Sequence, residues 1–502
     1  MPRRLANLAA FRFAVIAAAA CVAHAAPPDR GDLAAAYLRF ERAVEKAPKD
    51  AATRERANRS FDGLTGDFFA GRFDRALLTL ARSQSELPGG GPLGALEFLA
   101  SHRATLPSRT GEVGAPFDVR LSFERLDGMP VGTPPVEVVV RTPLGEVRSP
   151  YTEGFALPVT LERPGAVRVA VAFTGGFEAE VARAFVMAGP IDALRGELAA
   201  RVDALAAKGG VPESTLASLR ARCALLSASL ERTRSAALLA DLPTLADELS
   251  REIDAADRGE RPYACTGDRW RVFKALGTEL PTRQYVPAGA AEAPRPLLIA
   301  FHGAGGDENL FFDGYGGVLR QLADARGMSV VCPPTVPFGL SPVLLERFLD
   351  EVARDIEFDR SRVLLVGHSM GAATASRLAA LRPDLVRGAA CIAGFADVAR
   401  SKPPAPRHVW LAVLDPLFAL DRTRASVEAV AARVGNIELT VVPHEGHTLV
   451  VGEVLAQAVD WLLALKTATT APQASAPSTS PMKVGVLAPA AAAPSASAGP
   501  MK

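Results

Sequence analysis

The sequence predicts an α/β fold for its C-terminal part, in which helices cover a mostly parallel sheet, preceded by helical and small β-sandwich-like segments. Three observations carry this prediction. After residue 258, apolar strand-like runs alternate with Ala- and Leu-rich helix-like runs, as in a parallel sheet. Residues 114–189 alternate apolar and polar side chains with a period of two, as half-buried strands do. Residues 190–257 place leucines at helical spacing.

Composition narrows the class of protein. A chain of 502 residues is too long for one ordinary core and suggests about three domains. A formal net charge of +1 provides no basic surface, which argues against a nucleic-acid partner. The hydrophobic fraction of 49% reflects abundant alanine, and we expect no integral membrane span. We expect no metal or cofactor, and no C-x-x-C spacing occurs among Cys223, Cys265, Cys332 and Cys391.

The first 25 residues have the pattern of a signal peptide. Arg3 and Arg4 precede an apolar core at residues 13–20, and residues 23–25 match an A-x-A cleavage site. The apolar core is too short to favour an N-terminal anchor helix. Cys21 leaves a further alternative, lipid anchoring, because it follows three alanines as in a weak lipoprotein cleavage site. We therefore expect an exported protein, periplasmic or secreted.

Four further segments are predicted in chain order. Residues 26–110 indicate a small helical bundle, with a single tetratricopeptide-type helix pair as the alternative. Residues 114–189 indicate an immunoglobulin-like sandwich, a spacer or else a unit that binds substrate or associates with the cell surface. Residues 190–257 indicate a helical hairpin that links to the domain at residues 258–466. The Ala/Pro/Ser-rich residues 467–502 are expected to be disordered.

The most informative motif of the C-terminal domain is Gly367-His368-Ser369-Met370-Gly371. It closes the apolar run at residues 363–366 and opens the Ala-rich run at residues 372–376. A serine between a strand and a helix stands exposed on a strained turn, which needs a glycine on each side. The pattern predicts that Ser369 is a nucleophile, and the alternative is a tight structural turn.

A second turn follows the apolar run at residues 296–301 and reads His302-Gly303-Ala304-Gly305-Gly306. Two backbone N–H groups commonly stabilise the oxyanion of an acyl-transfer intermediate. We expect the amides of Ala304 and Met370 to do so. His302 is expected to act as a hydrogen-bonding residue beside the site, and not as the base, which follows the serine in this chain order.

A serine nucleophile needs a histidine base and a carboxylate that orients it. Only three histidines follow Ser369, and of these His447 is favoured over His444 because it lies at a strand-to-helix loop; His408 is the third. Asp415 ends the strand-like run at residues 409–414 and is the favoured carboxylate. Its rivals are Asp397 and Asp421, and Asp421 is more simply explained as the N-cap of a helix.

With these motifs in place, residues 263–465 resemble the α/β-hydrolase family, and within it secreted polyhydroxybutyrate-depolymerase-like and feruloyl-esterase-like serine esterases. The resemblance rests on residues 302–309, 326–334 and 358–363 and on the serine turn, and it covers well under half of the chain. It implies ester hydrolysis through an acyl-serine intermediate. Two alanines, Ala372 and Ala412, stand where close relatives often carry glycine.

The function predicted from the sequence is therefore a serine esterase acting on a small-molecule or polymeric ester. His302, Asp307 and Phe312 are expected to border the substrate pocket, together with Glu308, Asn309, Phe311 and Tyr315. Two alternatives stay open. One is a peptidase of the prolyl-oligopeptidase type, which usually carries a β-propeller, and the other is a binding protein with a degenerate hydrolase domain.

Overall fold

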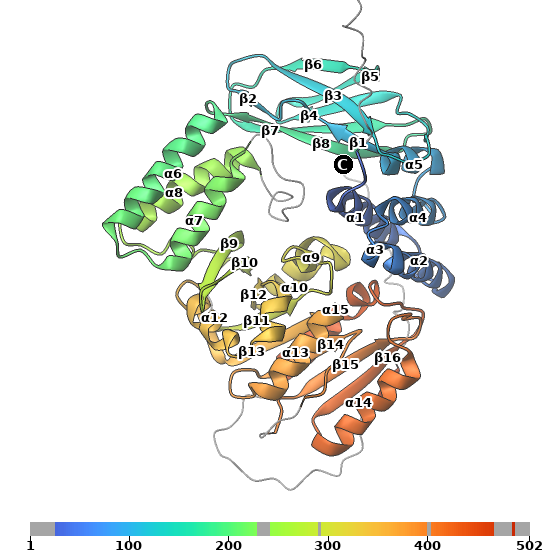
Figure 1. The fold of residues 1–502 in the computed structure, drawn as a ribbon, viewed down its shortest axis with the longest axis vertical. Coiled ribbons are helices and arrows are strands. Elements are labelled where there is room, and N and C mark those ends of the chain that lie inside the picture. Colours follow the sequence, from blue (N-terminus) through green and yellow to red (C-terminus); the bar gives the residue numbers. More distant parts are fainter. Residues whose placement is uncertain (1–25, 228–240, 290–292, 399–402, 466–483, 487–502) are drawn as a thin grey trace, which may run out of the picture.

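The computed structural model describes residues 26–227, 241–289, 293–398, 403–465 and 484–486 (Figure 1). The predicted signal peptide and Cys21 lie outside the described residues. Among the described residues, no helix combines the length and the apolar character that crossing a membrane requires.

Five helices form the N-terminal unit, which we call the helical unit (residues 30–101). They are α1 (Arg30–Lys46), α2 (Ala51–Gly63), α3 (Thr65–Phe69), α4 (Phe73–Ser85) and α5 (Leu93–Ser101). Asp29 caps α1 by accepting the N–H of Asp32, whose side chain accepts the N–H of Asp29 in return. The core of the unit contains Phe40 and Leu77, and Leu449 from the C-terminal domain joins it. The helical unit and the C-terminal domain therefore share a core.

Two antiparallel-rich sheets form the predicted sandwich. One has the strand order β1-β3-β6, and the other β2-β8-β7-β4-β5. Both sheets contribute to one core. Strand β3 alternates buried and exposed residues, as the period-two pattern predicts. The sandwich begins earlier than the predicted residue 114. The strands are β1 (His102–Thr105), β2 (Thr110–Glu112), β3 (Phe117–Arg125), β4 (Glu137–Thr142), β5 (Gly145–Pro150), β6 (Phe155–Val159), β7 (Gly165–Ala172) and β8 (Glu178–Met187).

In the described part of residues 190–257, three helices follow the sandwich, where the sequence predicts a hairpin. They are α6 (Ile191–Lys208), α7 (Glu213–Leu225) and α8 (Leu242–Asp257). Helix α7 attaches this group to strand β9 (Gly267–Ala275) of the C-terminal domain. The Ser218 hydroxyl accepts the N–H of Val272 (3.0 Å) and donates to its carbonyl (2.8 Å).

The C-terminal domain is built on one nine-stranded sheet in the order β17-β16-β15-β14-β13-β11-β12-β10-β9. The strands pair in parallel except at β9 and β10, which form an antiparallel edge. The predicted α/β fold is confirmed. After β9 come β10 (Thr278–Val286), β11 (Arg295–Phe301), β12 (Ser329–Cys332), β13 (Phe358–His368), β14 (Gly388–Ile392), β15 (Arg407–Ala412), β16 (Ile437–Val442) and β17 (Val484–Val486).

Helices cover both faces of this sheet. On one face, α10 (Leu319–Arg326) and α15 (Val450–Ala464) pack with the alternate side chains of the central strands. On the other face lie α12 (Leu344–Ala353), α13 (Met370–Leu381) and α14 (Leu420–Val434). The central strands are buried on both faces, which explains why they appear as continuous apolar runs in the sequence.

One segment differs from the prediction for the C-terminal tail. Val484–Val486 forms β17, which pairs in parallel with β16 at the edge of the sheet. The prediction of a wholly disordered tail is therefore wrong at these three residues. The free edge of β16 supplies backbone partners that the composition of the tail does not reveal.

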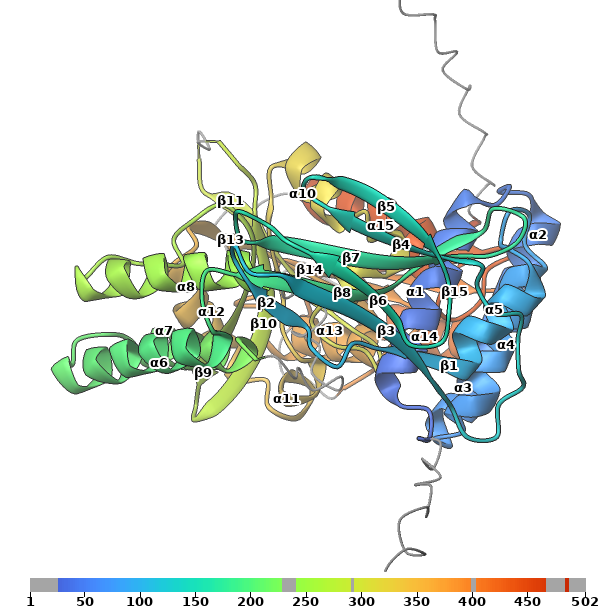
Figure 2. The same cartoon turned by 90° about the horizontal axis from the view of Figure 1, so that it is seen from above.

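The N-terminal helices lie against the C-terminal domain. The sandwich connects the helical unit to helices α6–α8. The helical unit and helices α6–α8 lie on opposite sides of the molecule in two perpendicular views (Figures 1 and 2). This course of the chain brings the helical unit against the C-terminal domain, where α1 contacts the short helix η2 (Tyr315–Gly317). Glu41 of α1 and Tyr315 of η2, which are 274 positions apart in the chain, thus meet at this contact.

Candidate active site

The turn at Ser369 has the predicted strand–turn–helix geometry. Ser369 lies between β13 and α13 with φ +54° and ψ −115°, a conformation that non-glycine residues rarely adopt. A Cβ on Gly367 would lie 2.2 Å from the carbonyl oxygen of Gly371, and one on Gly371 would lie 1.9 Å from that of Phe301. Both flanking glycines are therefore required by close backbone contacts. The Ser369 side chain borders the cavity of about 230 Å³ that is described below.

The structure brings Asp415 and His447 together. The Nδ1 atom of His447 lies 2.8 Å from Oδ2 of Asp415, and both side chains are buried. Oδ1 of Asp415 accepts the backbone N–H groups of Leu417 (2.8 Å) and Phe418 (3.1 Å), which fixes the carboxylate. A carboxylate at Nδ1 selects the tautomer that leaves Nε2 free to accept a proton.

The rival residues lie elsewhere. The ring of His444 faces Glu55 of α2, with Nδ1 2.8 Å from Oε1. Asp397 pairs with Arg433 at 2.5 Å. Asp421 lies in the first turn of α14, but it is not the N-cap, because that position is Ala419. Of the sequence candidates, only Asp415 contacts the ring of a histidine that borders the cavity.

The turn after β11 is held by His302. Its Nδ1–H donates to the Gly303 carbonyl (2.8 Å), and its Nε2 accepts the N–H of Thr335 (3.3 Å). Burial lowers the pKa of His302, so the ring is neutral and can make both bonds. A Cβ on Gly303 would lie 3.3 Å from Cβ of Ser369, so the turn lies against the serine. Ala304 borders the cavity, and Met370 opens α13 with an N-terminal amide.

A second buried histidine supports the loop that carries His447. The Tyr315 hydroxyl lies 2.7 Å from Nδ1 of His368, and Nε2 of His368 lies 2.9 Å from the His447 carbonyl. Burial lowers the pKa of His368 to about 3, so the ring is neutral. Nε2–H therefore donates to His447, and Nδ1 accepts from Tyr315. The sequence gives no sign of this role, because His368 occupies the variable position of the serine motif.

Helix α2 also holds this loop, through residues that the sequence does not mark as part of the site. Oδ2 of Asp62 accepts the backbone N–H of His447 (2.7 Å). Arg54 binds both carboxylate oxygens of Glu445 at 2.7 Å, and Asn58 donates to the His444 carbonyl (3.1 Å). No local signal in the sequence could have found these contacts, since the partners are about 385 residues apart.

Replacing Asp62 tests whether this contact positions His447. Asp62→Ala leaves a buried N–H without its acceptor, so we expect kcat on a short ester to fall about tenfold. Asp62→Asn keeps an acceptor oxygen and is expected to stay within about threefold of wild type. Steady-state kinetics of the two variants, with melting temperatures to establish folding, make the check. Equal losses in both variants would contradict a positioning role.

Helix α1 contributes a buried carboxylate with an unusual pKa. Glu41 accepts hydrogen bonds from the hydroxyl of Tyr37 and from the Tyr315 N–H (3.1 Å). Burial raises its pKa to about 7, and these hydrogen bonds offset the rise only in part. A carboxyl whose pKa is higher in the folded state than in the unfolded state destabilises the fold progressively as the pH rises from about 4.5 to about 7.

This shift gives a prediction for stability against pH. The wild type is expected to lose about 2 kcal/mol of unfolding free energy between pH 5 and pH 8 through Glu41. Glu41→Gln cannot ionise and should lack that loss. Urea denaturation of both proteins at the two pH values measures the difference. An identical pH dependence in the variant would show that Glu41 does not titrate as its burial implies.

Ser369 and His447 border one cavity of about 230 Å³. The turn at residues 303–307 forms one side, and the helical unit forms the other. Asp307 borders the cavity as predicted, and burial raises its pKa to about 6. Tyr315 and His368 also border it, whereas His302 does not.

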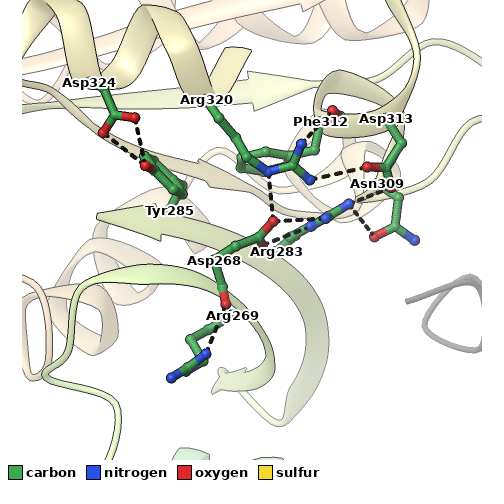
Figure 3. Close-up of polar contacts among 9 residues, drawn as sticks. All are labelled: Asp268, Arg269, Arg283, Tyr285, Asn309, Phe312, Asp313, Arg320 and Asp324. Atoms are coloured by element: carbon green, nitrogen blue, oxygen red, sulfur yellow. Dashed lines mark hydrogen bonds and ion pairs between the residues drawn. The ribbon is translucent and has the colours of Figure 1, made fainter. Parts of the chain in front are cut away.

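The prediction that Phe312 borders the pocket is wrong. Phe312 lies in α9 (Leu310–Asp313), is fully buried in the core and does not reach the cavity. The guanidinium groups of Arg283 and Arg320 lie over its ring at 4.9 and 5.3 Å. Both arginines bind Asp313, so the short helix is held with Phe312 facing inward (Figure 3). Phe311 is likewise a core residue.

A family model matches part of this domain. Residues 296–429 match the family model described as the alpha/beta hydrolase fold. The search of curated proteins gave no match. The C-terminal domain therefore has the alpha/beta hydrolase fold, as the sequence resemblance predicts.

Solved structures similar to the chain include three hydrolases. The feruloyl esterase module from Clostridium thermocellum is 15% identical, and the match covers 42% of this chain and 94% of that one, with a TM-score of 0.33. A thermostable esterase is 15% identical, with 65% and 89% covered and a TM-score of 0.36. S-formylglutathione hydrolase from Staphylococcus aureus is 13% identical, with 39% and 96% covered and a TM-score of 0.34.

Proposed function

We propose that the protein is a serine hydrolase that cleaves carboxylic esters through an acyl-serine intermediate. The observation that carries the proposal is the 2.8 Å contact between His447 Nδ1 and Asp415, on a histidine that borders the same cavity as the strained Ser369. A buried, oriented imidazole that borders the same cavity as a half-buried serine fits the arrangement that acyl transfer requires.

The proposed mechanism assigns one role to each residue. Nε2 of His447 takes the Ser369 proton as the oxygen attacks the ester carbonyl, and the imidazolium formed is stabilised by Asp415. The amides of Ala304 and Met370 stabilise the oxyanion. His447 then protonates the leaving alcohol, and water, activated by the same histidine, hydrolyses the acyl-serine.

The N-terminal half favours an esterase over the alternatives. Residues 26–227 and 241–257 form helices and a sandwich, and the described part of this half contains no β-propeller of the kind expected for the peptidase alternative. The buried contact of Asp415 with His447 argues against a degenerate hydrolase domain.

The proposal includes export, which rests on the pattern at residues 1–25 alone.

A comparison of ester and amide substrates tests the proposal. We expect the mature protein to hydrolyse p-nitrophenyl butyrate with a rate that saturates with substrate. We expect no detectable cleavage of a prolyl p-nitroanilide peptide under the same conditions. Cleavage of the anilide at a rate comparable to that of the ester would favour the peptidase, and no turnover of either would favour the binding protein.

A further inference from the structure

The helical unit supplies much of the wall of the cavity at Ser369. Helix α1 contributes Leu33, Ala34 and Tyr37, α2 contributes Phe61, and α3 contributes Phe68. These side chains are apolar apart from the Tyr37 hydroxyl, which donates to Glu41 within the helix. The wall therefore offers a substrate hydrophobic contact and few hydrogen-bonding groups.

This wall is fixed relative to the serine. A Cβ on Gly305 would lie 2.3 Å from Cζ of Phe68, so the phenyl ring lies directly on the turn after β11. The contacts of Glu41 with Tyr315 and of Asp62 with His447 join the same helices to the domain. The cavity is thus a preformed part of the fold, as small-molecule sites usually are.

Size and charge limit what the cavity can hold. Its volume of about 230 Å³ is just below the roughly 300–1,000 Å³ usual for small-molecule sites. Arg30 is the one lysine or arginine among the residues that line it, and its side chain is exposed at the rim. A carboxylate inside the apolar part would lose its hydration without a buried cation to replace it.

We propose that the helical unit selects esters with one compact, neutral, hydrophobic arm, such as a single aromatic ring or a short alkyl chain. This inference rests on the proposed function, because it concerns the same cavity. The arm is either the acyl group or the alcohol group, since both adjoin the carbonyl that Ser369 attacks. A larger side chain at a wall position should therefore reduce the maximum length of the hydrophobic arm that the enzyme accepts.

Two adjacent alanines of α1 provide a matched pair of variants. Ala34 borders the cavity, whereas Ala35 is exposed and does not. Two substrate series are compared: p-nitrophenyl esters from acetate to hexanoate, and alkyl acetates from methyl to hexyl. In each series we take the ratio of kcat/KM for the six-carbon member to kcat/KM for the shortest member. For Ala34→Phe, we expect this ratio to fall at least tenfold in one of the two series. Ala35→Phe should change neither ratio.

The series that responds assigns the arm to the acyl or the alcohol side. Phe68→Ala should act in the opposite direction, by shifting the preferred length in that series towards longer arms. This second variant removes a half-buried ring and keeps the test decisive where Ala34→Phe folds poorly. If Ala34→Phe and Ala35→Phe give the same ratios in both series, or if Phe68→Ala leaves the preferred length unchanged, the inference is overturned.

The charge of the arm is tested separately. Wild-type enzyme is expected to hydrolyse p-nitrophenyl butyrate at least tenfold more efficiently than p-nitrophenyl hemisuccinate at pH 8. Equal or better hydrolysis of the hemisuccinate would contradict a neutral arm.

A binding measurement separates this inference from the proposed function. In the Ser369→Ala background, calorimetric binding of p-nitrophenyl hexanoate should weaken at least tenfold with Ala34→Phe and stay unchanged with Ala35→Phe. Binding that behaves in this way without Ser369-dependent turnover in the wild type would refute the proposed function alone. Ser369-dependent turnover with identical binding in the two variants would refute the hydrophobic-arm inference alone.

Discussion

Ser369→Ala is expected to lower kcat for p-nitrophenyl butyrate by about 10⁴- to 10⁶-fold, because without the hydroxyl no acyl-enzyme can form. The small residual rate would come from the oxyanion amides and from substrate binding. Initial rates over a range of enzyme concentrations, with carboxylate formation measured directly, make the check. The melting temperature should stay close to that of the wild type, because the Ser369 side chain is only partly buried.

A matched control lies on the preceding strand. Ser361 in β13 is exposed, and its N–H and its hydroxyl both donate to Asp359 of the same strand. Ser361→Ala should therefore retain wild-type activity. A Ser369→Ala variant that stays within tenfold of the wild type would show that another group attacks the ester.

Asp415→Asn is expected to lower kcat by about 10⁴-fold while leaving KM nearly unchanged. The Asn amide can donate to Nδ1 and thereby select the tautomer in which Nε2 carries the proton and cannot accept one from Ser369. The carboxylate that stabilises the imidazolium is lost as well. Steady-state kinetics at pH 8 measure both effects.

The rival carboxylates serve as controls for this substitution. Asp397 and Asp421 are exposed, and Asp397 pairs with Arg433, whereas Asp415 is the carboxylate that contacts the ring of His447. Asp397→Asn and Asp421→Asn are each expected to keep activity within about twofold of the wild type. A large loss in either variant, with activity retained in Asp415→Asn, would move the acid of the site to that residue.

The parts of the site that could be predicted from the sequence are those that follow single strands. Ser369, Asp415 and His447 each lie in the loop or turn that follows an apolar strand, and parallel strands bring their carboxyl ends to one edge of the sheet. The glycines around Ser369 also mark a local backbone requirement that the sequence displays. These predictions needed no knowledge of distant contacts.

The parts that could not be predicted depend on contacts between distant segments. Asp62 and Phe68 belong to a helical unit whose pattern indicates only its own core, so their positions at His447 and Gly305 leave no local trace. Phe312 follows the turn closely enough to suggest a pocket residue, but Arg283 and Arg320, which lie over its ring, turn it inward. Strand β1 has uniformly half-buried residues and therefore lacks the alternation that would have marked it.

These contacts change the expected role of the N-terminal half. The sequence left the helical unit without a function, and the sandwich as a spacer or a binding unit. The structure makes the helical unit one wall of the cavity at Ser369 and a support for the loop of His447. The C-terminal domain alone would therefore carry an incomplete site, and truncation before residue 258 should remove hydrophobic-arm selection together with much of the activity.

Labelling with a fluorophosphonate, followed by peptide mass mapping, is the most direct test that Ser369 is the nucleophile, because the reagent bonds covalently to activated serines. We expect one adduct per chain on the peptide that contains Ser369, and none in Ser369→Ala. Labelling should be strongly slowed in Asp415→Asn. An adduct on a different serine, or no adduct on a correctly folded wild-type protein, would contradict the account of this site as a serine esterase.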